Sequence, residues 1–545
     1  MYSAFDGESF EHGGQTMQQL AAILLSPHLR YFSPTYWICV LLRFPRSLSL
    51  LLSFVRFGEA GDTLRQQSIG SLQQAYKLVR RARNTIPAYQ RHLAINPDIV
   101  NQWGSVPLLD KANYIQRNNL ADLLGQDYEQ TYAIFRSSGS SGKATYWPQL
   151  KSSDNLSARA LQAYLEACFS VHKKRTLVVV GLSLGSWIGG EHLAAQLKQA
   201  ALMVPYPLTI FAPGNHYDEI LEIVGKAEQF FDQIILAVCP SAIGHMLLLA
   251  QERSISLPLN KMKYLVLGEA FPESFRQGLQ QRSGLLASEP IMFSMYGSAD
   301  TGALGVESLY SVALRQLLLE SPALREKFGI IGVVPHLFHA CAPDAYLETV
   351  NEELIVTRWQ GIPLLRYNLH DRVELYSWKI TRQTVLALDS SSANETGLQE
   401  LIASASPHFP PLLAVYGRAD RCLILCGTNL TEGMLNATVK CLPLQTLLSG
   451  VYQARILYEQ GRQYLALDIE LQKGATISPA IDAHIYSTLV DELGKAQPEF
   501  ADDWQHIYSN WDKDVQSRVL RIQYHKWPKL SEALSGNIKQ AGIAT

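Results

Sequence analysis

Short apolar runs alternate with longer amphipathic stretches through the middle of this chain. Four of the runs are rich in aliphatic and β-branched residues and have the length of a buried strand: 176–182, 233–238, 263–269 and 290–297. Four of the stretches around them space their apolar residues as a helix does: 154–169, 190–202, 216–231 and 241–253. Strands that alternate with helices predict parallel β/α layers, whose ligands bind at the carboxyl ends of the strands.

The pattern differs on either side of this region. Residues 60–100 carry apolar residues at helical spacing, so we expect the first hundred residues to be helical. After about residue 345, short β-rich segments follow one another closely, which predicts an antiparallel subdomain. The stretch 385–410 is rich in Ser and Pro and is expected to be a surface excursion. The predicted fold class is α/β, with layered parallel β/α subdomains joined to a small β-containing subdomain.

The length and composition are those of a multidomain globular protein. The 545 residues exceed what one hydrophobic core supports, and 47% of them are hydrophobic against 18% charged. A formal net charge of -2 provides no field that would draw a nucleic acid onto the surface, so we expect no nucleic-acid partner.

The seven cysteines are scattered and stand mostly in apolar surroundings, as reduced core thiols do. This usage favours the cytoplasm. Cys422 and Cys426 are the only close pair, and no histidine or second cysteine pair stands at ligand spacing. We therefore expect no structural metal.

The N-terminal region is apolar without the pattern of a signal peptide or a membrane span. The acidic start MYSAFDGESFEHGG lacks a basic segment followed by an apolar run. Arginines and prolines interrupt the apolar residues 18–57, so a transmembrane helix is not expected. The segment YWICVLLRFPRSLSLLLSFVRF is either an amphipathic surface for peripheral contact with a membrane or partner, or a segment packed on the main domain.

A loop within IFRSSGSSGKATYW has the composition of a polyphosphate-binding loop. Its glycines permit close backbone approach, its hydroxyls and N–H groups donate hydrogen bonds, and its lysine neutralises charge. It is not a Walker A loop, because Ser137 and Ala144 stand where that motif requires a Gly and a hydroxyl residue. A flexible surface linker is the alternative. The loop residues are Ser137, Ser138, Gly139, Ser140, Ser141, Gly142 and Lys143.

The order of five motifs carries a family resemblance. The segments are SSGSSGK, LVLGEAFPESFR, SMYGSADTGALG, GIPLLRYNLHD and VYGRADRCLILCG, and VPLLDK precedes them. This order resembles the adenylate-forming superfamily, specifically its phenylacetate-CoA ligase-like branch, over roughly residues 80–440. The resemblance implies ATP-dependent activation of a carboxylic acid as an acyl adenylate, followed by acyl transfer. Coenzyme A is the default acceptor, with a carrier-protein pantetheine thiol or an amine as alternatives.

The resemblance also implies how the chain divides. Residues 81–418 would form the large domain that binds ATP and the acid, and residues 419–545 a small mobile α+β domain. Asp420 would be the hinge about which this C-terminal domain turns. Residues 1–80 precede the region of resemblance, and their apolar pattern predicts a helical N-terminal extension.

The same resemblance implies roles for individual residues. The loop from Ser137 to Lys143 would hold the ATP phosphates. Asp300 stands where a glutamate usually helps to hold Mg²⁺, and its carboxylate oxygen suits that ion. Asp371 would bind both ribose hydroxyls, and Arg418 would contact ribose or phosphate. The adenine would lie against five residues, with the tyrosine stacked on the ring: Gly268, Glu269, Ala270, Tyr296 and Gly297. Taken singly, these residues also suit turns and surface ion pairs.

Three departures from the family pattern bear on the chemistry. Ala299 replaces the usual threonine before the acidic residue, and Asp300 is one methylene shorter than glutamate. In the tail, Asn537 stands where the family has the lysine that bridges the carboxylate and the α-phosphate. Lys539 is the candidate substitute, since a cation there would stabilise charge in the transition state. A solvated tail lysine is the alternative.

The acid pocket is expected near 181–192 and 236–246 and just before Tyr296. Its candidate residues, which are also suited to a protein core, are Trp187, His192, His245 and Met295. Such a set favours an aryl or amino-substituted acid.

Two other functions compete with this interpretation. Gly181, Ser183 and Gly185 spell the G-x-S-x-G elbow of serine hydrolases after a predicted strand, and four later histidines could complete a triad: His336, His339, His370 and His408. A hydrolase would leave the phosphate loop unexplained. The second competitor is a nucleotide-binding regulatory or scaffold protein that has lost catalysis.

Overall fold

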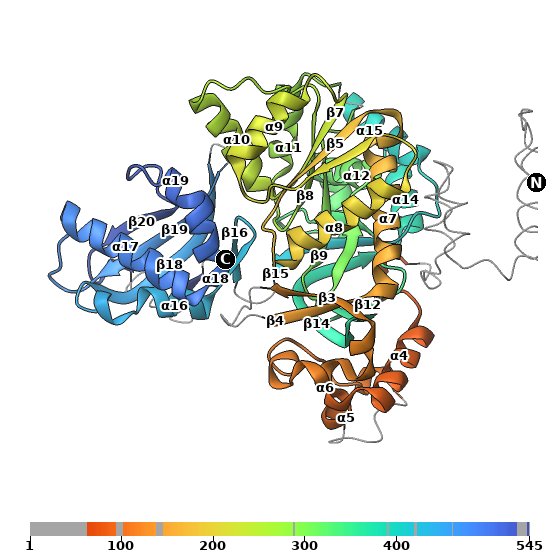
Figure 1. Ribbon diagram of the computed structural model, residues 1–545, viewed down its shortest axis with the longest axis horizontal. Coiled ribbons are helices and arrows are strands. Elements are labelled where there is room, and N and C mark those ends of the chain that lie inside the picture. The colour runs from red at the N-terminus through yellow and green to blue at the C-terminus, as the bar shows by residue number, and fades with distance from the viewer. Residues whose placement is uncertain are drawn as a thin grey trace, which may run out of the picture.

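The computed structural model describes residues 63–93, 102–137, 145–286, 289–389, 392–418, 422–459, 462–530 and 542–543. Thirteen strands within these ranges form one large sheet, and three small sheets stand apart from it. Helices cover the large sheet, and a smaller body that holds the C-terminal elements lies at its side (Figure 1). This architecture confirms the predicted α/β fold class.

The parallel half of the large sheet follows the predicted alternation of strands and helices. Its strands are β5 (Thr176–Gly181), β6 (Leu208–Phe211), β7 (Gln233–Val238), β8 (Met262–Leu267) and β9 (Met292–Ser298). The helices that connect or flank them are α7 (Lys151–Phe169), α8 (Ile188–Met203), α9 (Tyr217–Ala227), α10 (Pro240–Glu252) and α11 (Glu273–Ser283).

Strand β5 shows why these runs are continuously apolar. Successive side chains of a strand point to opposite faces. Val178 and Val180 pack with Leu197 of α8, whereas Leu177 and Val179 pack with Ile220 and other residues of α9 and α10. Both faces of the sheet are covered, so every position is buried.

An antiparallel half continues the same sheet. Antiparallel pairing was predicted for the region after residue 345 within a separate subdomain, but this half extends the large sheet instead. Its strands are β10 (Gly302–Val306), β11 (His336–Ala340), β12 (Tyr346–Val350), β13 (Glu353–Gln360), β14 (Ile362–Tyr376) and β15 (Leu412–Arg418), with the short β1 (Arg65–Gln66) and β2 (Ser68–Ile69) at its margin. Helices α12 (Leu309–Glu320), α13 (Pro322–Phe328) and α14 (Trp378–Leu386) pack on it.

The prediction that residues 385–410 form a surface excursion is wrong in one respect. It contains helix α15 (Ala393–Ser404), and Ile402 on that helix is fully buried in a cluster with Leu314 and Leu412. Ser392 begins the helix, because its side chain accepts a hydrogen bond from the backbone N–H of Glu395. Serine therefore acts here as a helix cap rather than as a loop former.

The N-terminal helices lie below the antiparallel half in Figure 1. They are α4 (Leu72–Thr85), α5 (Pro87–Leu93) and α6 (Leu120–Leu124). Ser71 caps α4, and Pro87 begins the next helix directly after it. Strands β3 (Thr131–Ser137) and β4 (Thr145–Leu150) form a separate hairpin between these helices and α7.

The C-terminal elements form their own sheets. Strands β16 (Cys422–Leu425) and β17 (Thr428–Thr431) pair as a hairpin. A second sheet contains β18 (Leu448–Glu459), β19 (Arg462–Leu471), β20 (Leu520–His525) and β21 (Gly542–Ile543). Its helices are α16 (Glu432–Val439), α17 (Pro479–Ala496), α18 (Pro498–Asp503) and α19 (Ser509–Trp511).

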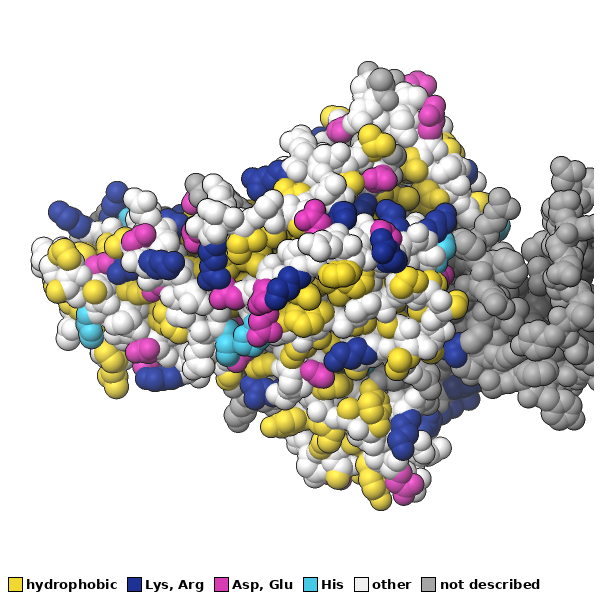
Figure 2. Space-filling model, turned by 45° about the horizontal axis from the view of Figure 1, so that its top comes forward, with side chains coloured by type: hydrophobic (Ala, Val, Ile, Leu, Met, Phe, Trp, Pro, Cys, Tyr) yellow, Lys and Arg dark blue, Asp and Glu magenta, His cyan; other side chains and the backbone are white. Residues whose placement is uncertain are grey.

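The surface and the cysteines fit the composition. On the face shown in Figure 2, acidic and basic side chains are interspersed among apolar ones. The cysteines of the described residues are free thiols, Cys168, Cys239, Cys341, Cys422, Cys426 and Cys441. Within the same part of the chain, no helix combines the length and the apolar character that crossing a membrane requires.

Candidate active site

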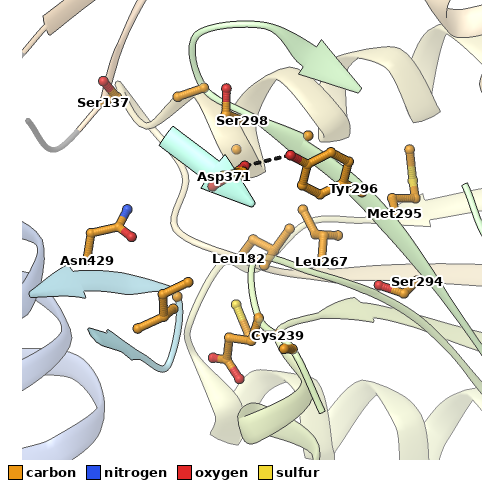
Figure 3. Close-up of a pocket in the computed structure, with 18 of the residues that line it drawn as sticks. Ser137, Leu182, Cys239, Leu267, Ser294, Met295, Tyr296, Ser298, Asp371 and Asn429 are labelled. Carbon is orange, nitrogen blue, oxygen red and sulfur yellow. Dashed lines mark hydrogen bonds between the residues drawn. The ribbon is translucent and has the colours of Figure 1, made fainter. Parts of the chain in front are cut away.

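A cavity of about 1040 Å³ opens where the parallel strands end. Its lining includes residues that follow β5, β7 and β8, such as Leu182, Cys239 and Gly268, together with Tyr296 near the end of β9. The hairpin β16–β17 closes another side with Asn429, which Figure 3 shows across the cavity from Tyr296. The cavity therefore lies where β/α layers place their ligands.

The predicted phosphate loop connects the two strands of the β3–β4 hairpin. Ser137 ends β3 and lines the cavity, and its Oγ accepts a hydrogen bond from Trp147 Nε1 at 2.9 Å. Residues 138–144 lie outside the described residues, so the roles of Ser138, Gly139, Ser140, Ser141, Gly142 and Lys143 stay predictions.

The segment after β8 presents Gly268, Glu269 and Ala270 to the cavity. Two buried side chains fix the backbone just beyond it. Nε2 of His336 lies 2.8 Å from the carbonyl oxygen of Phe271, and Nη2 of Arg315 donates to the same oxygen at 3.0 Å. Burial and the neighbouring guanidinium groups hold the pKa of His336 well below its usual value, so its imidazole is neutral.

Tyr296 and Gly297 stand beside this segment on β9. The ring of Tyr296 stacks on Phe338 at 5.5 Å, and its hydroxyl donates to Asp371 Oδ2 at 2.6 Å (Figure 3). Burial and the adjacent carboxylate raise the pKa of Tyr296 well above its usual value, so it remains a donor. A Cβ on Gly297 would lie 2.3 Å from the carbonyl oxygen of Gly302, which explains why glycine is needed there.

Asp371 and Arg418 face each other across two strands. They are register partners on β14 and β15, and Arg418 Nη1 lies 3.4 Å from Asp371 Oδ1. His370, one residue earlier, has a left-handed φ of 59°, a conformation that is rare for a residue with a side chain. Its backbone N–H donates to Asn368 Oδ1 at 2.7 Å and its Nδ1 lies 3.0 Å from Glu353, which together hold this turn of the strand.

A lysine that was not among the predicted site residues lies beside Asp300. Lys111 Nζ lies 3.0 Å from Asp300 Oδ1, and the hydroxyl of Tyr367 donates to Asp300 Oδ2 at 2.6 Å. Both Lys111 and Asp300 line the cavity. Leu109 forms a bridge to Tyr367, which brings the VPLLDK segment to this place. The VPLLDK segment belongs to the motifs of the family resemblance, and this was the available signal for Lys111. Nothing in the sequence showed that Lys111 would contact Asp300.

Three of the four candidates for the acid pocket line the cavity: Trp187, His192 and Met295. The side chain of the fourth, His245, lies outside the described residues, although its backbone belongs to α10. His192 Nε2 lies 3.1 Å from Gln196 Nε2, and its ring packs at 5.7 Å from Phe135.

Ser183 does not have the surroundings of a hydrolase nucleophile. Its Oγ accepts a hydrogen bond from the side-chain amide of Asn215 at 2.8 Å. Ring nitrogens of His336 and His339 contact the carbonyl oxygens of Phe271 and Pro410, and Nδ1 of His370 contacts a carboxylate oxygen of Glu353. A nucleophilic serine needs a hydrogen-bonded base, so the described geometry disfavours the hydrolase.

The predicted hinge Asp420 and the candidate catalytic lysine Lys539 fall outside the described residues, as does Asn537. Lys526 and Lys529 are described, are exposed and do not line the cavity.

Comparison with known proteins identifies the fold. No protein-family model and no curated protein matches the chain. A 2-hydroxyisobutyryl-CoA ligase, solved with 2-HIB-AMP and CoA in the thioesterification state, aligns with a TM-score of 0.52 and 12% identity over 86% of this chain and 91% of that chain. An acyl acid amido synthetase in complex with 2,4-DB aligns with a TM-score of 0.43 and 11% identity over 92% and 95% of the two chains. A malonyl-CoA ligase with methylmalonyl-CoA and AMP bound aligns with a TM-score of 0.37 and 12% identity over 72% and 70%. The first alignment shows a shared fold.

Proposed function

Since this chain has the fold of an adenylate-forming ligase, we propose that it binds ATP and activates a carboxylic acid as its acyl adenylate. The observation that carries the proposal is the convergence of separate motifs on one cavity. The segment after β8, the end of β9, and the paired strands β14 and β15 each contribute the residues that the sequence motifs predict for a nucleotide. Convergence of this kind favours a binding site over unrelated turns and surface pairs.

The nucleotide is proposed to lie between these segments. Asp371 accepts hydrogen bonds from the ribose hydroxyls, and Tyr296 both holds that carboxylate and presents its ring to the adenine. Arg418 opposite Asp371 contacts ribose or phosphate. Gly268, Glu269 and Ala270 border the base.

In the proposed reaction, a carboxylate oxygen of the acid attacks the α-phosphorus of ATP. The bond from that phosphorus to the bridging oxygen breaks, and acyl-AMP and pyrophosphate form. Negative charge develops on the α-phosphate, so a fixed cation beside it lowers the barrier. Lys111 is the lysine that lines the cavity within the described residues, and we assign it this role, with Lys539 as the tail candidate.

Asp300 is the residue proposed to hold Mg²⁺. Among the described residues, no cluster of three or more His, Cys, Asp or Glu side chains is arranged for a metal. Magnesium bound with a nucleotide needs only one or two protein carboxylates, because phosphates and water supply its other ligands. Asp300 fits this requirement if Lys111 turns from Oδ1 toward a phosphate, while Tyr367 continues to hold Oδ2. The bound ion would neutralise phosphate charge.

The acid and the acceptor occupy the remaining sides of the cavity in this proposal. The acid lies against Trp187, His192 and Met295, a set that suits an aromatic ring. Coenzyme A is the default acceptor, with a carrier-protein thiol or an amine as alternatives. The small C-terminal domain would rotate about Asp420, and its hairpin β16–β17 already lines the cavity. Free thiols and this chemistry both suit the cytoplasm.

Pyrophosphate release with Mg·ATP across a panel of aryl, amino and fatty acids tests the proposal. The unmodified protein is compared with Asp371→Ala and with Asp218→Ala, which alters an exposed carboxylate on α9 away from the cavity. We expect acid-dependent release that survives in Asp218→Ala and is lost in Asp371→Ala. Silence with every acid, while ATP still binds, would favour the non-catalytic nucleotide-binding protein.

A further inference from the structure

The cations that line the cavity differ in whether they have an anionic partner. Among the described residues, Lys111 pairs with Asp300, Arg315 with Glu273, and Arg418 with Asp371. Arg136 also lines the cavity, but within the described part of the chain its side chain forms no ion pair and no hydrogen bond, and its Nε atom is shielded from solvent without a partner. A guanidinium carries five donors and cannot be neutralised. A partly buried guanidinium that lines a cavity without an anionic partner therefore points to an anion that a ligand supplies.

The position of Arg136 is fixed by its surroundings. Its backbone N–H donates to the carbonyl oxygen of Ser186 at 2.7 Å, and it forms a bridge with Trp187. Its guanidinium carbon lies 4.1 Å from the centre of the Trp187 ring. Packing over a tryptophan ring holds the guanidinium in place and leaves the donors of its two Nη atoms available. The group is thus preorganised to bind a planar anion.

The neighbours of Arg136 place it on the acid side of the cavity. Trp187, over whose ring the guanidinium lies, precedes α8, which also carries His192 and Gln196, and these three residues line the cavity. The adenine and ribose residues come instead from the segments after β8 and on β9, β14 and β15. None of the carboxylates among the described residues forms an ion pair with Arg136. Glu191, in the first turn of α8, accepts a hydrogen bond from the backbone N–H of Gly185 at 3.1 Å instead.

We propose that the acid substrate carries a second anionic group, a distal carboxylate in the simplest case, and that Arg136 binds that group while the other carboxylate is adenylated. This inference rests on the proposed acid activation. It names the substrate class as dicarboxylic acids, and it disfavours an amino-substituted acid because an ammonium group would meet the unpaired guanidinium.

Matched acids that differ in one carboxylate test the inference. The pairs are 4-carboxyphenylacetate with 4-methylphenylacetate, and adipate with hexanoate. Rates of pyrophosphate release are compared for the unmodified protein, Arg136→Met and Arg136→Lys. The control is Arg81→Met, because Arg81 also stacks on a tryptophan, Trp359 at 3.9 Å, but neither residue lines the cavity.

We expect the unmodified protein to prefer a diacid over its matched monoacid. Arg136→Met should lower kcat/KM for the diacid on the order of 10- to 100-fold, the range of a charged hydrogen bond. The monoacid and the KM for ATP should stay within about 2-fold, because only the lost anion contact differs. Arg136→Lys should recover part of the loss, and Arg81→Met should show none. Equal losses for both members of a pair, or a raised KM for ATP with either acid, would overturn the inference and place a phosphate at Arg136.

Calorimetric titration of the same acids separates this inference from the proposed activation. If the unmodified protein binds a diacid but releases no pyrophosphate, adenylation is wrong, and loss of that binding in Arg136→Met still supports the anion site. Equal binding by Arg136→Met, or no binding of any diacid to the unmodified protein, overturns the inference.

Discussion

Replacing Lys111 with methionine removes the Nζ atom that lies 3.0 Å from Asp300 Oδ1 and keeps much of the side-chain volume. The side chain of Lys111 is 20% exposed and that of Asp300 is 9% exposed, so the pair is shielded from most solvent screening. The hydroxyl of Tyr367 would remain as the partner of Asp300 Oδ2. Two consequences follow, one for stability and one for catalysis.

The stability cost should be modest. Breaking a fully buried ion pair costs about 3 to 5 kcal/mol, and exposed pairs contribute about 0 to 1 kcal/mol. Because this pair is partly exposed and Asp300 keeps the hydrogen bond from Tyr367, we expect about 1 to 2 kcal/mol. Urea unfolding of Lys111→Met, Asp300→Asn and the double variant measures this cost, and the coupling free energy between the two residues should be about 1 kcal/mol.

The catalytic cost should be larger. Removing one donor from the developing charge of a transition state costs on the order of 10²- to 10³-fold in kcat. Pyrophosphate release by Lys111→Met should fall by that factor with a smaller change in the KM for ATP, and Lys111→Arg should recover part of it. Lys151→Met, which changes an exposed lysine at the start of α7, is the control. Full activity in Lys111→Met would refute the assignment of Lys111 as the cation beside the α-phosphate and would favour Lys539 in that role.

Three further changes probe the nucleotide site and the fold. Tyr296→Phe loses the 2.6 Å hydrogen bond to Asp371, so the KM for ATP should rise on the order of 10-fold with kcat nearly unchanged, as steady-state kinetics would show. Gly297→Ala places a Cβ 2.3 Å from the carbonyl of Gly302, so ATP binding measured by calorimetry should be lost; unchanged affinity would contradict the packing. Burial lowers the pKa of His339 to about 4, so below pH 6.5 the unfolded chain binds a proton that the folded one does not. Stability present at neutral pH should therefore fall by about 2 to 3 kcal/mol as the pH drops toward 4, and His339→Gln should flatten this dependence in urea unfolding.

The strands and helices of the parallel half could be predicted because the local hydrophobic pattern of each segment reflects its burial. Strands β5, β7 and β8 are mostly apolar runs, as burial on two faces requires, and β9 is buried over its first three residues. Strand β6 was not predicted, because the four residues Leu208–Phe211 are too few to show a recognisable hydrophobic pattern. Helix α15 was missed because capping serines resemble loop residues until their hydrogen bonds are known.

The site could be predicted where a motif places its residues and not where distant segments meet. Asp371 and Arg418 were identified from separate motifs, and the sheet sets them opposite each other. The partners of Lys111 and Arg136 were not predictable, because Asp300 and Trp187 reach them through tertiary packing alone. Whether a guanidinium has an ionic partner can be decided only from the three-dimensional structure.

The central claim is that the acid carboxylate is joined to the α-phosphate of ATP, and oxygen-isotope transfer tests it most directly. An acid that supports turnover is labelled with ¹⁸O in its carboxylate, and AMP and pyrophosphate are analysed by mass spectrometry after acyl transfer. Attack on the α-phosphorus predicts one labelled oxygen in AMP and none in pyrophosphate. Label in inorganic phosphate with ADP as the second product, or unlabelled AMP, would contradict acyl-adenylate formation.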